Sequence, residues 1–454
     1  MKIINPATGA LITEMAEDNT SAVIAKYQTA KTAQKKWANV PLNERIACIA
    51  KFNELILKNA DKIAADLTPE VGKPLGQAAG EINGGVTRSS YFVRESEKYL
   101  SEEWMVTEGD TREKITYEPL GVIANISAWN YPILVGVNVF IPALIGGNAV
   151  LYKPSEYSTL TGLNMAEMLW QAGVPKDVFQ VVVGGKNAGE ALLDLPLNGY
   201  FFTGSYNTGK YIAERVAGKL VPLGLELGGK DPMYVCEDVD VKAAASAGVE
   251  GAFYNNGQSC CAVERIYVHE AIYNDYLEAF LTEAKAMKVG NPTENETFIG
   301  PLTRPQQIEV LENQVLDAVQ KGAQLLLGGS RINKPGFYFE PTVLANVNHT
   351  MQVMMDESFG PVIGIQKVKN DQEALALMLD TPYGLTSAVY TKNEARALGM
   401  MQQLNSGTVY WNCCDRVSPN VPWSGRGNSG LGSTLSHAGI RTFVQPKAYH
   451  LRGK

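Results

Sequence analysis

Apolar positions recur along this chain in two patterns, and their order predicts the fold. Residues 20–100 carry apolar side chains at helical spacing, which predicts successive amphipathic helices. Between residues 121 and 224, short apolar runs of strand length alternate with helical stretches. Short buried strands joined by helical crossovers are typical of a parallel sheet covered on both faces. This region therefore predicts a doubly wound α/β domain, with strands expected at 121–126, 149–152, 179–183, 200–202 and 221–224.

A second alternating region follows a glycine-rich boundary at residues 227–232. It predicts a second α/β domain, with strands at 264–268, 361–367, 387–391 and 407–411 and helices between them. We expect a dinucleotide-binding domain from residues 1–101 and 120–228, and a catalytic domain from residues 229–424. The motifs described below are the reason for these two roles.

Two further segments, residues 102–119 and 437–454, predict a small β element that bridges domains or subunits. Residues 114–119 alternate like an exposed strand. We expect a last strand at 442–451 to pair with it near Ile115, within the chain or on another subunit. The glycine-rich stretch 424–432 predicts a loop.

The composition limits the partners of this chain. Its 40 basic and 47 acidic residues give a net charge of −7 without any basic run, so we expect neither nucleic acid nor an anionic membrane surface as a partner. The longest apolar stretch, residues 136–151, is broken by proline, glycine and asparagine, and we expect no membrane span. The six cysteines form no CxxC pair and only four histidines occur, so no metal site is expected. Without an apolar signal core at the start, a reducing cytoplasm is the expected location.

The sequence around Cys260 is the strongest candidate for chemistry. Residues 255–261 read Asn-Asn-Gly-Gln-Ser-Cys-Cys, between a helical run and a strand-like run. A polar loop between two apolar elements is a common place for a reactive side chain. A cysteine thiolate is a strong nucleophile and needs no histidine where the local field is positive. The alternative is that Cys260 is a buried, inert thiol.

Two further polar residues follow predicted strands. Glu226 lies between Leu225 and Leu227, and because burial raises the pKa of a carboxylate, it could act as a base toward water. A structural salt bridge is the alternative for Glu226. Asn130 lies in the Trp-Asn-Tyr-Pro turn at 129–132, where its amide could stabilise an oxyanion by roughly 3 kcal/mol. The alternative for Asn130 is an asparagine that merely forms the turn.

A nucleotide cofactor has two predicted contacts. In residues 200–209 a strand, a tight turn and a helix start follow each other, with Gly204 and Ser205 in the turn. The positive end of a helix is a good seat for a pyrophosphate, and a merely capped helix is the alternative. Lys153 and Glu156 follow another strand, where Glu156 could accept the hydroxyls of a ribose and repel a 2′-phosphate. This pair favours NAD over NADP, unless it belongs to an ordinary solvated loop.

Together these motifs resemble the aldehyde dehydrogenase superfamily. Its motifs occur in the family's order along nearly the whole chain, from residue 5 to about residue 445: Trp-Asn-Tyr-Pro, Lys-Pro-Ser-Glu, Phe-Thr-Gly-Ser, Leu-Glu-Leu-Gly-Gly-Lys, Asn-Gly-Gln-Ser-Cys and Glu-Ser-Phe-Gly-Pro. The resemblance implies that Cys260 is the nucleophile, Glu226 the general base and Asn130 the oxyanion donor. It implies that NAD is held by Lys153, Glu156, Gly204, Ser205, Glu357 and Phe359. The turn that carries the last two is, in isolation, equally typical of an acidic surface loop.

The mechanism implied by this resemblance passes through Cys260. The thiolate attacks an aldehyde, the thiohemiacetal loses a hydride to the nicotinamide, and water activated by Glu226 hydrolyses the thioester to an acid. We expect NAD-dependent, non-acylating aldehyde oxidation by a homodimer or homotetramer. Val139 stands where many relatives carry a lysine, and Thr434 where many carry a glutamate. Those two family residues have been linked to proton exit, so that relay is in question here.

The substrate pocket allows two interpretations. Tyr131, Tyr254 and Trp423 match positions that form an aromatic box in betaine aldehyde dehydrogenases, and such a box attracts a trimethylammonium group by roughly 0.5–2 kcal/mol. A fourth box position is Asn138, so the match is partial, and the same rings could line a pocket for any apolar aldehyde. Arg416 could instead pair with the carboxylate of a semialdehyde.

Two other classes of function stay open. An NAD-independent thiol hydrolase or esterase would use Cys260, but it normally needs a paired histidine, and none lies near in the sequence. A catalytically silent structural relative is the other alternative, and the joint presence of Cys260, Glu226 and Asn130 argues against it. Glu226 also favours release of an acid over transfer to coenzyme A.

Overall fold

The first of two large sheets is six-stranded and carries the cofactor motifs. The computed structural model describes residues 1–453. The strand order is β19-β9-β8-β5-β6-β7, and all neighbours are parallel except β19, which runs antiparallel to β9. The strands are β5 (Val122–Ile126), β6 (Ala149–Lys153), β7 (Phe179–Val181), β8 (Gly199–Thr203), β9 (Leu223–Glu226) and β19 (Gly430–Leu431). The predicted parallel sheet is confirmed, whereas the stretch 424–432 predicted as a loop contributes an edge strand.

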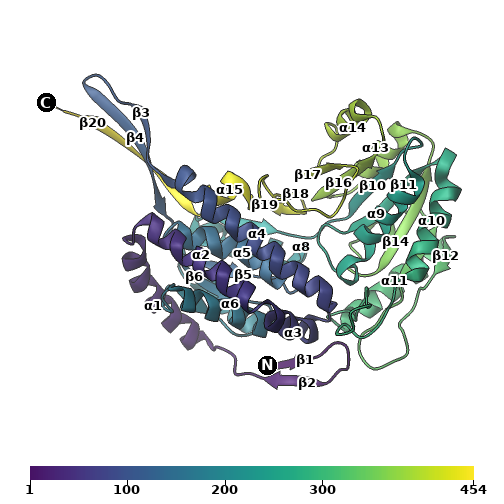
Figure 1. Cartoon of the computed structure of the whole chain (residues 1–454), viewed down its shortest axis with the longest axis horizontal. Helices are drawn as coiled ribbons and strands as arrows, with labels where there is room; N and C mark the ends of the chain where they lie inside the picture. The colour runs from purple at the N-terminus through teal and green to yellow at the C-terminus, as the bar shows by residue number, and fades with distance from the viewer. Residues whose placement is uncertain (454) are drawn as a thin grey trace.

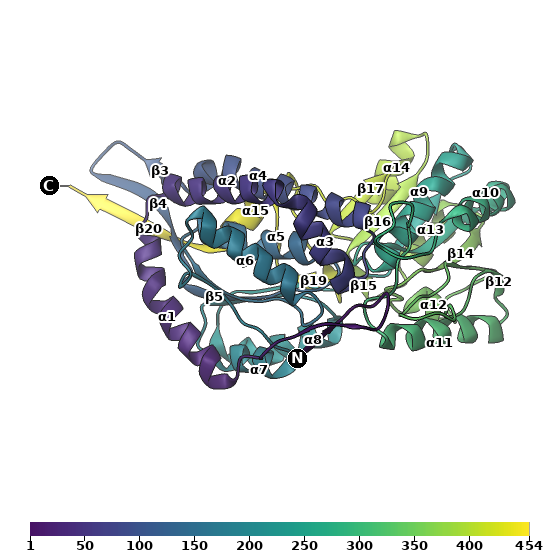
Figure 2. The same ribbon diagram turned by 60° about the horizontal axis from the view of Figure 1, so that its bottom comes forward.

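Helices cover both faces of this sheet, as its strands buried along their whole length require. Figure 2 shows α7 and α8 on one face, with α1 beside them, and the remaining helices on the other. The helices are α1 (Thr20–Ala38), α2 (Leu42–Lys58), α3 (Ala60–Val71), α4 (Leu75–Leu100), α5 (Pro132–Ile145), α6 (Thr159–Ala172), α7 (Lys186–Asp194), α8 (Tyr206–Val216) and α15 (Ser436–Arg441). The doubly wound class predicted from the pattern is therefore confirmed.

The second sheet has seven strands in the order β12-β13-β14-β11-β10-β16-β17. They are β10 (Asp231–Val235), β11 (Val263–His269), β12 (Gln324–Leu327), β13 (Thr342–Ala345), β14 (Val362–Val368), β16 (Thr386–Tyr390) and β17 (Thr408–Trp411). Its helices are α9 (Val241–Phe253), α10 (Tyr273–Ala286), α11 (Gln306–Gln320), α12 (Gln352–Met355), α13 (Asp371–Leu379) and α14 (Glu394–Met401). Strand β10 was missed because the glycine-rich boundary at 227–232 runs directly into it. The exact domain limits given above stay predictions.

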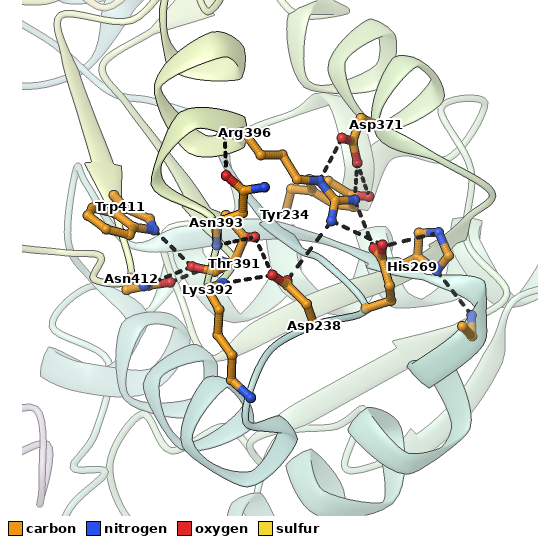
Figure 3. A network of polar contacts seen from close by, with 12 residues as sticks. Tyr234, Asp238, His269, Asp371, Thr391, Lys392, Asn393, Arg396, Trp411 and Asn412 are labelled. Carbon is orange, nitrogen blue, oxygen red and sulfur yellow. Dashed lines mark hydrogen bonds and ion pairs between the residues drawn. The ribbon is translucent and has the colours of Figure 1, made fainter.

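Polar contacts around Arg396 join the helices of this second region to its sheet (Figure 3). The Arg396 guanidinium of α14 donates to Asp371 at the start of α13, at 2.7 Å from Nε, and to Glu237 after β10, at 2.8 Å from Nη2. The hydroxyl of Tyr234 in β10 donates to the same Asp371 at 2.8 Å. Arg396 thus joins helix α14 to helix α13 and to the segment that follows strand β10.

A three-stranded antiparallel sheet extends from the body of the molecule (Figure 1). It consists of β3 (Glu103–Val106), β4 (Thr111–Pro119) and β20 (Val444–Arg452). Ala448 pairs with Ile115 of the same chain, so the predicted pairing is confirmed and its partner strand is intramolecular. The last strand predicted at 442–451 is observed at Val444–Arg452, and the start of the segment 437–454 belongs to helix α15, which continues to Arg441.

Smaller elements complete the chain. Strands β1 (Lys2–Ile4) and β2 (Leu11–Glu14) form one hairpin, and β15 (Tyr383–Gly384) pairs with β18 (Arg426–Gly427). Short 3-10 turns cover Ala217–Lys219, Tyr254–Gly257 and Glu270–Ile272. Within residues 1–453, none of the helices combines the length and the apolar character that crossing a membrane would demand.

Candidate active site

The loop before Cys260 is held in an unusual backbone conformation. It follows α9, and Asn255, Asn256 and Gly257 have φ values of 54°, 61° and 70°. Asparagine and glycine tolerate this left-handed region best, which explains their use here. Gly257 is also required by space, since a Cβ there would lie 2.3 Å from the carbonyl oxygen of Gly360. The loop is therefore a fixed platform for Cys260.

A cavity of about 650 Å³ lies in front of Cys260. Glu226 lines the same cavity, so the structure brings the predicted nucleophile and the predicted base to one space. The three predicted aromatic residues, Tyr131, Tyr254 and Trp423, also line it. Residues from four distant parts of the chain thus meet as the sequence motifs predict.

Glu226 stands at the end of β9 with its carboxylate partly buried. Thr434 donates a hydrogen bond from its hydroxyl to Oε1 of Glu226. Burial raises the pKa of Glu226, and the hydrogen bond from Thr434 opposes that rise. A carboxylate with a raised pKa can take a proton from water near neutral pH. Where many relatives carry a glutamate, this chain has Thr434, a neutral side chain that contacts the predicted base, Glu226, directly.

The neighbouring thiol, Cys261, is engaged elsewhere. Its Sγ donates to Oδ1 of Asp415 at 2.9 Å, and Ser259 donates to the same oxygen at 3.3 Å. A hydrogen bond with Cys260, burial and the Asp415 carboxylate raise the pKa of the Cys261 thiol well above its ordinary value. Cys261 is thereby kept protonated and held by Asp415, so Cys260 is the stronger candidate nucleophile of this pair.

Asn130 is packed against the Cys260 loop. Its side chain is 4% exposed, and its Nδ2 donates to the carbonyl of Gln258 at 3.1 Å. The carbonyl of Asn130 accepts from Nδ2 of Asn255 at 3.1 Å. One N–H of the Asn130 amide is therefore used to hold the loop, and its second N–H is the donor left for an oxyanion. Asn130 itself is not among the residues that line the cavity.

A second cavity of about 600 Å³ lies at the carboxyl ends of β5, β6 and β8. Ligands collect at this edge of a parallel sheet. Lys153, Glu156 and Gly204 line it, as predicted. Ser205 lies beside it and uses its hydroxyl to cap α8, accepting from the backbone N–H of Thr208 at 3.4 Å.

This second cavity fits a dinucleotide. Gly204 is required by space, since a Cβ would meet the ring of Phe202 at 2.4 Å. Nζ of Lys153 lies 3.9 Å from Oε2 of Glu156, which puts a donor and an acceptor side by side for a ribose. The start of α8 supplies backbone N–H groups suited to a pyrophosphate.

The turn with Glu357 and Phe359 lies beside the second cavity. Glu357 accepts from the backbone N–H of Gly229 at 3.2 Å, next to the strand that carries the base. Burial raises the pKa of Glu357 to about 8. Phe359 packs edge-to-face on Trp129 with ring centroids 5.5 Å apart, and Trp129 lines the second cavity. Neither Glu357 nor Phe359 is itself a lining residue of either cavity.

The sequence did not single out four charged residues of the first cavity: Glu81, Arg88, Glu250 and Asp415. Arg88 belongs to α4, whose pattern predicts an amphipathic helix and nothing more. The available signal was a charged residue on the buried face of that helix, since Arg88 is 8% exposed. Asp415 has its pKa raised to about 7 by burial. The next residue, Arg416, was the one predicted from the sequence to contact a substrate carboxylate.

The comparisons with known proteins agree with this geometry. The model of the family described as "Aldehyde dehydrogenase family" matches residues 1–449. A Synechocystis protein named "Probable succinate-semialdehyde dehydrogenase", with NADP(+) in its name, is 33% identical over 98% of this chain and 98% of its own. The betaine aldehyde dehydrogenase of Bacillus subtilis is 32% identical over 98% of this chain and 92% of its own.

A solved structure is equally similar. The NAD-dependent aldehyde dehydrogenase from Sinorhizobium meliloti superposes with a TM-score of 0.96 at 32% identity, covering 99% of this chain and 91% of that one. The likeness therefore extends over the whole of both sheets.

Proposed function

Since this chain belongs to the aldehyde dehydrogenase family and is an oxidoreductase that acts on aldehydes with NAD or NADP, we propose that it oxidises its substrate to a carboxylic acid through a covalent adduct on Cys260. One observation carries this proposal: Cys260 and Glu226 line the same cavity, while a cavity suited to a dinucleotide opens at the adjacent sheet edge. A hydrolase with no use for a dinucleotide would not need that second cavity.

The first step is addition of Cys260 to the aldehyde. The thiolate forms a bond to the carbonyl carbon, and the carbonyl oxygen becomes an oxyanion. The second N–H of the Asn130 amide and the backbone N–H of Cys260 are the donors that we assign to this charge. NAD or NADP, when bound, supplies the acceptor for the hydride that leaves the same carbon.

The second half of the reaction is hydrolysis. Loss of the hydride leaves a thioester on Cys260. Glu226 takes a proton from water, the hydroxide adds to the thioester carbon, and the Cys260 thiolate departs with release of the acid. Burial raises the pKa of Glu226, which supports this role because a raised pKa makes a carboxylate a stronger base toward water.

NAD is the preferred cofactor in this proposal. Glu156 lines the second cavity and remains exposed, so its carboxylate would repel the 2′-phosphate of NADP. Lys153 offers a compensating cation at 3.9 Å, which leaves room for some use of NADP.

Assembly through the projecting sheet belongs to the same proposal. Strand β3 exposes Trp104, Met105 and Val106, an apolar edge that a second subunit could cover. We propose a symmetric dimer or tetramer on this basis.

The direct test is NADH or NADPH formation by the purified full chain with a panel of aldehydes. The panel includes simple alkanals, betaine aldehyde and 4-oxobutanoate, because the aromatic residues and Arg416 leave both charged classes open. Acid release in proportion to reduced cofactor supports the proposal. Ester or thioester cleavage without any aldehyde oxidation would replace it by a hydrolase.

A further inference from the structure

Arg88 occupies an unusual position in the wall of the Cys260 cavity. It projects from α4 and is 8% exposed, yet it lines the cavity. Its Nη1 donates to Oδ1 of Asn138 at 3.1 Å and to the carbonyl of Leu134 at 3.5 Å. Across residues 1–453, neither Nε nor Nη2 of Arg88 has a hydrogen-bond acceptor, and no carboxylate lies within ion-pair distance.

The other deeply buried cations of the chain use more of their donors or face a carboxylate. Arg45, which is 9% exposed and has no carboxylate partner, donates from Nε and Nη1 to three backbone carbonyls and lines neither cavity. Lys73 is paired with Glu81, and Lys230 lies 2.6 Å from Oε2 of Glu264. Arg265 donates from all three of its nitrogens to carbonyl or hydroxyl oxygens. A buried cation is costly unless its donors are hydrogen-bonded or it is paired with an anion. The unused donors of Arg88 therefore indicate a partner that enters from the cavity.

The acidic groups that line the cavity are already committed. Glu81 accepts from the backbone N–H of Ile133 at 2.8 Å besides its pairing with Lys73. Asp415 accepts from Cys261 and Ser259, and Glu226 accepts from Thr434. The remaining acid, Glu250, is exposed. None of these carboxylates lies within ion-pair distance of Arg88: burial lowers the pKa of its guanidinium, and the more distant charge of Glu226 opposes that shift. A second arginine, Arg416, lines the same cavity.

Arg88 also makes the three aromatic residues of the cavity less suited to binding a cationic substrate. Asn138, the position where a full aromatic box would have its fourth ring, is the residue that anchors the guanidinium. In addition, the Lys73 ammonium lies 4.0 Å from the centroid of the Tyr131 ring, so one face of that ring already holds a cation. A trimethylammonium group in this cavity would meet positive charge where a cation-binding site needs rings.

We propose that Arg88, anchored by Asn138, is the specificity-determining residue of this pocket and binds a carboxylate at the end of the substrate remote from its aldehyde. The substrate class is then an ω-oxo carboxylate, and a guanidinium suits it because its donors Nε and Nη2 match the two oxygens of a carboxylate. This inference rests on the proposed function for its chemistry, but not for its binding step.

The test compares Arg88→Met with the parent enzyme on matched substrates. 4-Oxobutanoate, 5-oxopentanoate and 6-oxohexanoate are each paired with their methyl esters, which keep the aldehyde and lose the charge. We expect the best oxo acid to lose about 10- to 100-fold in kcat/KM, mostly through KM, while the KM of its ester changes by less than about threefold. Arg94→Met, an exposed arginine on the same helix, is the matched control and changes neither.

Two further variants keep the test decisive. Asn138→Asp places a carboxylate against the guanidinium, and we expect the same selective loss of oxo-acid turnover without removal of the arginine. Arg416→Met tests the other cation of the cavity. A selective loss in Arg416→Met with none in Arg88→Met would overturn the proposal, as would an equal loss on acid and ester.

Binding without turnover separates this inference from the proposed function. Glutarate, a dicarboxylate that mimics the product, is titrated by calorimetry into the full chain. We expect binding by the parent and the Arg94→Met control, and a loss of about tenfold or more in Arg88→Met. Glutarate binding in a chain that oxidises no aldehyde would refute the proposed function alone. If the chain oxidises alkanals or betaine aldehyde but neither binds glutarate nor oxidises the oxo acids, the role of Arg88 alone is refuted.

Discussion

Thr434 donates a hydrogen bond from its hydroxyl to the carboxylate of Glu226, a residue 208 positions earlier in the chain. Two backbone hydrogen bonds between Trp423 and Thr434, each 2.8 Å long, fix the position of that hydroxyl. The base therefore has a neutral neighbour that can hold its charged form. Val139, at the other position where relatives carry a titratable side chain, is 4% exposed within α5 and has no proton to offer.

Replacing Thr434 by valine should move the pH dependence of turnover. The hydrogen bond from Thr434 lowers the pKa of Glu226, so its loss raises that pKa further. Because the base acts when deprotonated, the acidic limb of the kcat profile shifts to higher pH, and turnover on that limb falls by about three- to tenfold. Steady-state rates from pH 5 to 9 measure this shift. Thr434→Ser keeps a hydroxyl and should retain the parent profile; an unmoved profile in the valine variant would show that the contact has no catalytic weight.

Glu226→Gln should separate the two halves of the reaction. The glutamine cannot take a proton from water, so hydrolysis of the thioester slows by about 100-fold or more while hydride loss continues. Stopped-flow absorbance should then record a burst of reduced cofactor close to one equivalent per active site, followed by slow turnover. A steady rate equal to the parent would identify a different base.

The two adjacent cysteines should respond very differently to substitution by serine. Cys260→Ser removes the nucleophile, and we expect no measurable oxidation although cofactor still quenches or enhances protein fluorescence on binding. Cys261→Ser keeps a donor toward Asp415, and its rate should stay within about threefold of the parent. Single-turnover experiments on both variants check this. Activity that survives in Cys260→Ser and fails in Cys261→Ser would reverse the assignment.

Arg396→Met should lower stability in a pH-dependent manner. Hydrogen bonds from Arg396 hold the pKa of Glu237 below its ordinary value, so this contribution is present above the unfolded pKa and is lost as the pH falls through the folded one. We expect a loss of about 1–2 kcal/mol at pH 7 that shrinks below about pH 4.5. Urea unfolding at several pH values measures it. Arg94→Met, which removes an exposed pair with Glu95, should change little, and a pH-independent loss in Arg396→Met would point to packing instead.

The parallel sheet and most residues of the candidate site could be predicted from the sequence because both depend on local patterns. Apolar runs between turn residues located β5, β6, β8 and β9, and polar residues at their carboxyl ends located Glu226, Asn130 and Lys153. Strand β10 was lost because Pro232 and the preceding glycines have the composition of a boundary. Its central place between β11 and β16 comes from tertiary pairing alone.

Arg88 could not be found in this manner, and Thr434 was noted only because the resemblance places it where many relatives carry a glutamate. Both act through contacts with residues distant in the chain, Arg88 with Asn138 and Thr434 with Glu226. A helical arginine and a loop threonine carry no local sign of such contacts. Their roles become visible only when burial and unused donors are counted in three dimensions.

The antiparallel pairing of β19 with β9 sets a limit on when the enzyme can begin to work during its own synthesis. Gly430 lies opposite Glu226, and the hydroxyl that steadies the base comes four residues later. During synthesis, Glu226 and Cys260 are added to the chain long before residues 430–434. Under the proposed mechanism, a nascent chain therefore lacks the Thr434 hydrogen bond to Glu226 until almost its last segment has been made, and truncated chains should contain Cys260 and Glu226 without that contact.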